Sequence, residues 1–337
     1  MFRQALCDKY LDPAQPLPDA FEDLRALRIL SLPSFGIVEI GLLDDIPPSS
    51  VERVSELDLN GNRLAWTAVS ELSTKLPLPH LKTLSLSSNP LGNFCDSCIP
   101  WFSKLCVLVL DNAAIALADV RSVLVQAPEL QELSLCQNGM CHLGEGVLTA
   151  DTARQLRTLR LAFSKKNNAF ADWASLDPIS VLPSLTALNV SNNDIACIPA
   201  VSSVFGPASP DVAGVAPDGA GAAVRASPFS KLRSLNLSRC PIDRWESIDA
   251  LGEFPALRDL RIVDCPLPSP DAETTRLLAI ARLPNVAAGG HGLQTVGSET
   301  AGLLNGSAIS RMERRGGRNF LCGFFWLAGK HGRAPSV

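Results

Sequence analysis

The sequence has few histidines: His80, His142, His291 and His331 are all that its 337 residues contain. No two of them are spaced as metal ligands or catalytic partners, and each falls in an expected loop or turn. A nucleophile elbow, a Walker loop and a dinucleotide-binding fingerprint are also missing. The glycine cluster at residues 289–292 follows an expected helix, not a strand, which argues against a phosphate cradle. We therefore expect a protein that is not an enzyme and that has no catalytic residues, no metal and no cofactor.

The sequence also lacks a surplus of positive charge and any long apolar run. Its formal net charge is −4 and its pI is about 5.6, whereas a nucleic-acid partner requires a clustered positive field. Basic runs at residues 165–166 and 311–318 are expected to be solvated. No stretch approaches the roughly 18 apolar residues of a membrane span, and residues 1–15 carry no signal-peptide core. We expect neither a nucleic-acid partner nor a membrane partner.

The ten cysteines follow no metal-binding or disulfide pattern. Cys95 and Cys98 form a lone CxxC without a second pair at zinc-site spacing, so free thiols are expected. Cys136, Cys240 and Cys265 fall at or beside turns of the repeat described next, where a small buried hydrophobe fits. Unpaired cysteines are typical of a reducing compartment, and the sequence therefore predicts a cytoplasmic protein.

What the sequence does contain is a leucine-rich pattern, seen most clearly at residues 54–64 (VSELDLNGNRL). Leu57 and Leu59 are two residues apart, as in a short strand with one buried face. Asn62 follows at the point where the chain must turn, and its side-chain amide can bond backbone groups that the bend leaves unpaired. This combination is the signature of a leucine-rich repeat.

The pattern recurs along most of the chain, with a period of about 26 residues between Leu27 and Leu185. Such recurrence predicts an α/β leucine-rich repeat solenoid, with a curved parallel sheet on its concave side and helices and turns on its convex side. The residues at the central leucine and at the asparagine position of each repeat are Leu30 and Phe35, Leu57 and Asn62, Leu84 and Asn89, Leu108 and Ala113, Leu133 and Asn138, Leu159 and Ser164, Leu188 and Asn193, Leu235 and Cys240, and Leu260 and Cys265.

We divide the chain by this pattern. Residues 1–23 carry three prolines and no clear period, and are expected to be a lead-in linker with about one helical turn. Residues 24–286 form the leucine-rich repeat domain. Residues 199–228 are rich in alanine, glycine and proline and are expected to form a flexible insertion within it. Residues 287–337 are expected to be an irregular tail that contains an LNGS…ER segment.

Three helices are expected from apolar residues three and four apart. Two are return segments on the convex side, at residues 67–76 and 117–125, and several such segments end at a proline before the next strand. The third, at residues 272–283, is expected to cap the open end of the solenoid. Its residues expected to face the last repeat are Leu277, Ile280 and Leu283.

Because the sequence shows no catalytic group, the candidate site is a protein-binding surface. The residues between the buried leucines should point to the concave face, which solenoids commonly use to bind other proteins. This face is polar, acidic in its N-terminal part and more basic in its C-terminal part; a solvated sheet face without a partner would look similar. The candidate partner-binding residues are Glu56, Asp58, Asp111, Asn112, Glu132, Arg160, Asn189, Asn236, Arg239, Asp259, Arg261 and Asp264.

Three tryptophans recur after a strand, namely Trp66, Trp173 and Trp245, each expected to seat a return helix on its repeat. Three further segments are characteristic: LNLSRCPIDRWESIDALGEFPALRDLRIVDCPL (residues 235–267), RLLAIARLPNV (276–286) and LNGSAISRMERR (304–315). Together with the residues around the tryptophans, they resemble the leucine-rich domain of the tubulin-folding cofactor E (tubulin-specific chaperone E) family. FGIVEIG (35–41) and ELDLNGNRLAWTAV (56–69) fit the same family, so the resemblance runs from about residue 24 to 315.

The resemblance implies binding to α-tubulin or the αβ-tubulin dimer, together with other tubulin-folding cofactors, in tubulin folding and in assembly or disassembly of the dimer. It further implies a cytoplasmic, cytoskeleton-associated protein. Family members normally carry a CAP-Gly domain and a ubiquitin-like domain, and neither pattern is visible in this sequence. The alternative is a generic cytosolic leucine-rich repeat scaffold for a different protein partner, because composition and repeat pattern would be the same.

Overall fold

The computed structural model describes residues 1–11, 21–94, 99–144, 146–162, 170–200, 228–283, 285–286, 303–310 and 312–314. The chain forms two compact units. The first unit comprises Met1–Ala169 and Leu182–Val190, and the second comprises Phe170–Val181 and Ser191–Val337. The predicted insertion (residues 199–228) lies almost entirely outside the described residues, as do the CxxC pair, the basic run at 165–166 and the glycine cluster at 289–292.

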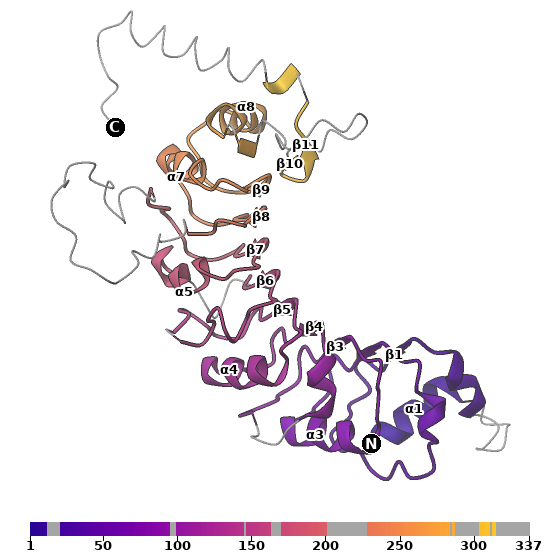
Figure 1. Cartoon of the computed structure of the whole chain (residues 1–337). Coiled ribbons are helices and arrows are strands. Elements are labelled where there is room, and N and C mark those ends of the chain that lie inside the picture. Colours follow the sequence, from indigo (N-terminus) through magenta and orange to yellow (C-terminus); the bar gives the residue numbers. More distant parts are fainter. Residues whose placement is uncertain are drawn as a thin grey trace, which may run out of the picture. The chain divides into compact units, whose positions relative to one another are not determined.

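The first unit contains seven short strands that pair in parallel with their sequence neighbours (Figure 1). The register is the same throughout, because the central leucine of each strand faces the central leucine of the next, as Leu57 faces Leu84. These strands are β1 (Ile29–Ser31), β2 (Glu56–Asp58), β3 (Thr83–Ser85), β4 (Val107–Val109), β5 (Glu132–Ser134), β6 (Thr158–Arg160) and β7 (Ala187–Asn189).

The second unit continues the same pattern. Strand β8 (Ser234–Asn236) pairs in parallel with β9 (Asp259–Arg261), and β9 pairs in parallel with β10 (Leu303–Leu304). Strand β11 (Ser307–Ala308) then turns back antiparallel to β10. The predicted leucine-rich repeat fold is confirmed.

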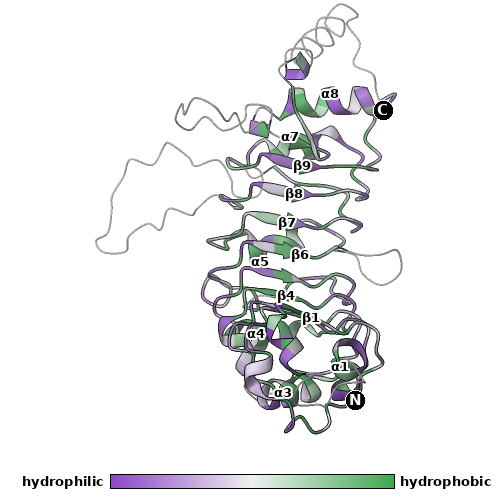
Figure 2. Ribbon diagram, turned by 90° about the vertical axis from the view of Figure 1, so that its right-hand side faces the viewer, coloured by the Kyte–Doolittle hydropathy of each residue, from purple (hydrophilic) through white to green (hydrophobic). Residues whose placement is uncertain are grey.

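The helices that connect successive strands lie, within each unit, on one side of the sheet (Figure 1). The two predicted return helices are present, and so is the predicted helix at residues 272–283, which is α8 (Figure 2). The helices are α1 (Phe2–Tyr10), η1 (Phe21–Ala26), η2 (Pro48–Ser50), α3 (Trp66–Lys75), η3 (Pro100–Lys104), α4 (Leu117–Gln126), η4 (Ala174–Leu176), α5 (Asp177–Ser180), α7 (Trp245–Leu251) and α8 (Ala272–Arg282). No helix in these described parts is long and apolar enough to cross a membrane.

The asparagine position of the repeat is a buried hydrogen-bonding site. Asn89, which is 1% exposed, donates from Nδ2 to the carbonyls of Leu59 and Leu86 (2.9 Å each) and accepts at Oδ1 from the backbone N–H of Leu64 (3.0 Å). Asn62 makes the equivalent bonds one repeat earlier. The amide thereby satisfies the backbone groups freed where each strand ends, as the sequence predicts.

The residue before this position adopts a left-handed backbone conformation in most repeats. Its φ is 67° at Gly61, 56° at Ser88 and 61° at Arg239, and its N–H donates to a carbonyl of the next repeat. A Cβ added to Gly61 would approach Ser34 Oγ to 2.7 Å, so a larger residue here would require the hydroxyl of Ser34 to move. The first repeat departs from the pattern, because Phe35 at its asparagine position is 42% exposed.

The prediction that residues 1–23 are a lead-in linker with about one helical turn is wrong for the first ten residues. Residues Phe2–Tyr10 form α1, which buries Phe2, Ala5 and Leu6. The hydroxyl of Tyr10 donates to the carbonyl of Ser31 (3.1 Å) and accepts from the N–H of the same residue (2.9 Å), which satisfies backbone groups at the outer edge of β1. The start of the chain is therefore an N-terminal cap for the sheet of the first unit.

The prediction of an irregular tail is wrong at residues 303–308, which form β10 and β11. Asn305 and Gly306 make the hairpin turn with φ values of 53° and 80°. Arg276 of α8 holds the hairpin, since it donates to the carbonyl of Leu304 (2.7 Å) and to Glu313 Oε1 (2.7 Å). Within α8 itself, Ile280 is buried as expected, and so is Leu283 just beyond it, whereas Leu277 is half-exposed.

A pH-dependent contribution follows from the pair of Arg276 and Glu313. The hydrogen bond from Arg276 lowers the pKa of Glu313 from 4.5 to about 2, so the pair stabilises the hairpin fully above pH 4.5 and less as the pH falls towards 2. We expect Glu313→Gln to destabilise the hairpin by about 1–2 kcal/mol at neutral pH. Faster amide hydrogen exchange in β10 and β11 would show this. The difference between the two proteins should shrink below pH 4.5, and equal exchange at pH 7 would contradict the prediction.

Candidate protein-binding surface

Each unit presents a sheet face, which we define as the side chains that flank the central leucine of each strand, with the turn residues that directly follow the strand. Of the predicted residues, Glu56, Asp58, Glu132, Arg160 and Asn189 lie on the strands of the first unit. All are half-buried or exposed, whereas the leucines between them are at most 2% exposed. The alternation of burial along these strands therefore places these polar side chains toward solvent, although Ser134 of β5 is itself buried, at 2% exposed.

Several carboxylates on this face are held by their neighbours. Asp58 accepts at Oδ2 from the hydroxyl of Ser31 (3.0 Å) on the preceding strand. Asp111 accepts at Oδ1 from the hydroxyl of Ser134 (2.6 Å) and from the backbone N–H of Cys136 (2.8 Å). These bonds join adjacent repeats, so Asp58 and Asp111 fix the register of the sheet as well as contributing negative charge to the sheet face.

The positive charge on this face is also compensated. Arg160 of β6 lies 3.6 Å from Glu132 of β5, and both side chains are more than 40% exposed. An exposed pair at this distance contributes little to stability. It does cancel much of the field of both groups, whereas Glu56, Asp58 and Asp111 have no ion pair among the described residues of the first unit.

Sequence reasoning missed an apolar part of the same face. Val107 and Val109 of β4 flank Leu108 and are half-buried. In the sheet register Val107 lies between Thr83 and Glu132, and Val109 lies between Ser85 and Ser134. Ile29 of β1 is 52% exposed. The repeat spacing could have identified these valines, because Val107 and Val109 occupy the same repeat positions as Glu132 and Ser134. Only polar residues at these positions were considered as candidates.

The predicted residues of the second unit divide into strand and turn positions. Asn236, Asp259 and Arg261 lie on the sheet face. Arg239 and Asp264 are not strand residues but occupy the left-handed turn position, with φ values of 61° and 57°. They pair with each other across adjacent repeats, with Arg239 Nε 3.1 Å from Asp264 Oδ2.

Asn112 of the first unit occupies the same turn position, with a φ of 52°. It lines a shallow polar hollow of about 590 Å³ at the turns that follow β3, β4 and β5. Its Nδ2 donates to the hydroxyl of Ser88 (3.3 Å) across this hollow. Asn112, Arg239 and Asp264 thus belong to the border of the sheet face and not to its centre.

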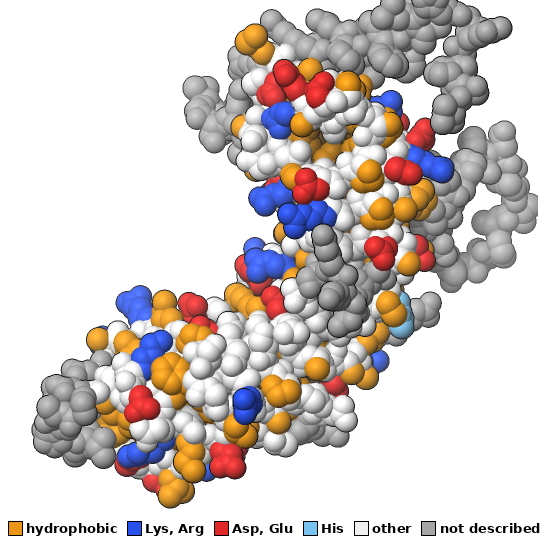
Figure 3. Space-filling view, turned by 180° about the vertical axis from the view of Figure 1, so that it is seen from behind, with side chains coloured by type: hydrophobic (Ala, Val, Ile, Leu, Met, Phe, Trp, Pro, Cys, Tyr) orange, Lys and Arg blue, Asp and Glu red, His pale blue; other side chains and the backbone are white. Residues whose placement is uncertain are grey.

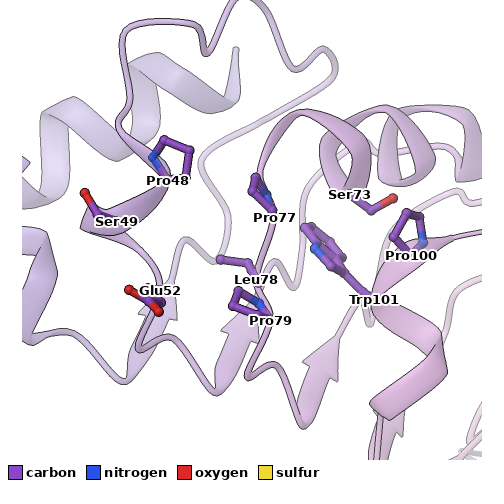
Figure 4. Close-up of a pocket in the computed structure, with 9 residues that line it drawn as sticks. All are labelled: Pro48, Ser49, Glu52, Ser73, Pro77, Leu78, Pro79, Pro100 and Trp101. Carbon is purple, nitrogen blue, oxygen red and sulfur yellow. The ribbon is translucent and has the colours of Figure 1, made fainter.

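A second hollow, of about 420 Å³, lies on the helix side of the first unit. Figure 4 shows Pro48 and Glu52 on one side of it, and Pro77, Pro100 and Trp101 on the other. The indole of Trp101 is already engaged, since its Nε1 donates to the carbonyl of Leu76 (3.1 Å). None of the predicted partner-binding residues lines this second hollow. Its lining is mainly apolar and includes one carboxylate, that of Glu52.

Two thiols of the second unit, Cys240 and Cys265, are poorly suited to nucleophilic chemistry. Burial raises the pKa of Cys240 to about 12 and that of Cys265 to about 11, so both remain protonated at neutral pH. Cys265 stands at the asparagine position and donates from Sγ to the carbonyl of Leu237 (3.3 Å), as asparagine does elsewhere. Within the described ranges, no three His, Cys, Asp or Glu side chains gather as a metal site requires. What the arrangement offers is an extended surface for another protein.

Comparison with known proteins identifies the family. The Leucine Rich repeat family model matches residues 78–93 and 181–196. The human tubulin-specific chaperone cofactor E-like protein is 31% identical over 345 residues, which cover 96% of this chain and 71% of the relative. The chain belongs to the tubulin-specific chaperone cofactor E-like family. Tubulin-folding cofactor E of Arabidopsis thaliana is 28% identical over 307 residues, covering 90% of this chain and half (50%) of that protein.

Membership of the cofactor E-like family agrees with the resemblance seen in the sequence. Among solved structures, human 5T4 (Wnt-activated inhibitory factor 1, trophoblast glycoprotein) has a similar fold, with a TM-score of 0.51 at 19% identity over 76% of this chain and 83% of that chain. At that identity the likeness shows the fold alone. The cofactor E-like names, and not the fold, therefore point to a partner.

Proposed function

We propose that the chain binds tubulin and acts as a non-enzymatic cofactor in tubulin folding or in assembly and disassembly of the αβ dimer. The observation that carries this proposal is the similarity to the tubulin-specific chaperone cofactor E-like protein over nearly the whole chain. The sheet faces support it, because they expose charged, hydroxyl-bearing and apolar side chains on a rigid array of strands. The partner is α-tubulin or the αβ dimer, with other folding cofactors, in the cytoplasm and in association with the cytoskeleton.

Gel filtration of the purified chain mixed with αβ-tubulin tests the proposal. A stoichiometric complex supports a binding cofactor, and a shift of tubulin from the dimer to a smaller complex with α-tubulin supports dimer dissociation. Separate elution at micromolar concentrations would contradict the proposal. That result would favour the alternative, a leucine-rich repeat scaffold for a different protein.

The sheet face of the first unit can be tested with two matched substitutions. Val109→Arg places a charge on β4 at the apolar part of the face, whereas Val125→Arg places the same charge on α4, where Val125 is already 62% exposed. We expect Val109→Arg to weaken tubulin binding at least about tenfold, because a desolvated charge at an interface centre is costly, and Val125→Arg to have little effect. Melting curves check that both variants are folded. Equal affinities for tubulin would remove this face from the interface.

A further inference from the structure

Three arginines of the second unit lie at or directly before two adjacent strands, β8 and β9. Arg233 directly precedes β8 and Arg258 directly precedes β9, and the register of the two strands places them side by side. The backbone N–H of Arg258 donates to the carbonyl of Arg233 (2.8 Å). Arg261 ends β9 on the same sheet. Arg233 and Arg261 are exposed and Arg258 is half-buried.

Two carboxylates stand close to these arginines along the chain. Asp259 accepts at Oδ2 from the hydroxyl of Ser234 (3.0 Å), and its buried Oδ1 has no hydrogen-bond partner among the described residues. Asp264 pairs with Arg239. In the part of the second unit that the structure describes, no ion pair joins Arg233, Arg258 or Arg261 to a carboxylate.

One of the three guanidinium groups is oriented by the backbone. Arg258 Nη1 donates to the carbonyls of Pro255 (3.1 Å) and Leu257 (2.7 Å), which fixes the group and leaves its remaining N–H donors for a ligand. A fixed guanidinium loses less conformational entropy on binding than a free one. The planar fork of arginine matches a carboxylate with two parallel hydrogen bonds.

We propose that Arg233, Arg258 and Arg261, which we call the arginine cluster, bind an acidic peptide segment of a partner, in which Asp or Glu side chains follow one another. This inference goes beyond the proposed function, because it depends on the second unit alone and holds whichever protein carries the segment. It also revises the sequence-based site, since Arg239 is committed to Asp264 while Arg233 and Arg258 were not among the predicted residues.

A peptide fits this surface better than a nucleic acid does. The chain as a whole carries a net charge of −4, and acidic and basic side chains are interspersed in the view of Figure 3 without a continuous field of one sign. Residues 233–236 and 258–261 contain no aromatic side chain on which a base could stack. A small cluster with fixed guanidinium geometry suits carboxylates, whereas a nucleic-acid backbone requires an extended basic surface.

Fluorescence anisotropy with a labelled poly-glutamate peptide tests the proposal, with a poly-glutamine peptide of equal length as the reference ligand. We expect the full chain to bind poly-glutamate in a salt-dependent manner and not to bind poly-glutamine. Replacing all three arginines by glutamine should weaken binding about tenfold. If the triple variant is not folded, Arg233→Gln with Arg261→Gln leaves the hydrogen bonds of Arg258 intact and should still weaken binding several-fold.

Arg157→Gln is the matched control. Arg157 precedes β6 as Arg233 precedes β8, and it is exposed, but its neighbours at this repeat position are Gln131 and Thr186. We expect it to leave poly-glutamate binding unchanged. Absence of binding at low salt, equal weakening by Arg157→Gln, an unaffected triple variant, or tighter binding of a single-stranded oligonucleotide would each overturn the proposal. Tubulin binding is measured separately, so either proposal can fail while the other stands.

Discussion

Replacing Asn89 by alanine is expected to lower the free energy of unfolding by about 3–5 kcal/mol. The side chain is 1% exposed and makes three hydrogen bonds of 2.9 to 3.0 Å to the backbones of two adjacent repeats. Without it, the N–H of Leu64 and the carbonyls of Leu59 and Leu86 lose a partner in a place that water does not reach. A buried polar group without a partner costs about 1–3 kcal/mol, and alanine also leaves a cavity.

Urea denaturation followed by circular dichroism measures this loss, and hydrogen exchange at Leu64 locates it. Asn112→Gly is the matched control, because Asn112 follows the next strand in the same kind of turn but is exposed and has a φ of 52°, which glycine adopts without strain. We expect Asn112→Gly to change the free energy of unfolding by less than about 1 kcal/mol. A similar loss in both variants would mean that the turn, and not the buried amide, carries the stability.

The repeated core could be predicted because it depends on the spacing of leucine and asparagine residues within each repeat. Leu57, Leu59 and Asn62 follow each other at distances that a short strand and a buried turn impose, and the same spacing returns throughout both units. Each repeat contacts mainly its neighbours, so a local pattern determines the tertiary structure in a solenoid. For the same reason the return helices α3 and α4 were predicted within one residue of their ends.

The two caps were missed because their patterns are short. In α1, Phe2, Ala5 and Leu6 show helical spacing over little more than one turn, and the proline-rich stretch that follows suggested a linker. Strands β10 and β11 have two residues each, too few for an apolar alternation. The Asn305–Gly306 pair was the available signal for a hairpin, and the Oδ1 of Asn305 accepts from the N–H of Ile262 (2.8 Å), as a repeat asparagine would.

The residues of the sheet faces could be predicted from the sequence, but which of the charged side chains form ion pairs could not. The sequence indicates that both Arg239 and Arg261 are exposed, yet the first pairs with Asp264 and the second has no ion pair in the described part of its unit. Such pairs join residues about one repeat apart and depend on register and turn geometry. A list of exposed charged residues therefore overstates the number that remain available to a partner.

Two of the three recurring tryptophans occupy the first position of a helix. Helices α3 and α7 begin at Trp66 and Trp245, and in neither does the preceding residue provide a side-chain cap. Trp66 is 1% exposed and packs edge-on against Phe94 and Phe102, with ring centroids 4.9 and 6.1 Å away. Aromatic packing thus takes the place of a polar cap in seating α3 on its repeat.

Trp66→Ala should consequently destabilise the first unit by about 3–5 kcal/mol, the usual cost of emptying a buried tryptophan site. Trp66→Phe should cost no more than about 2 kcal/mol, because the ring contacts remain and the Nε1–H of Trp66, which has no hydrogen-bond partner among the described residues, is removed. Trp101 provides the contrast: its Nε1 donates to the carbonyl of Leu76 at 3.1 Å, so Trp101→Phe should cost about 1 kcal/mol more than Trp66→Phe. Urea titrations of the three variants give the order. If Trp66→Phe proved as damaging as Trp66→Ala, the shape of the indole, and not aromatic burial, would be what seats α3.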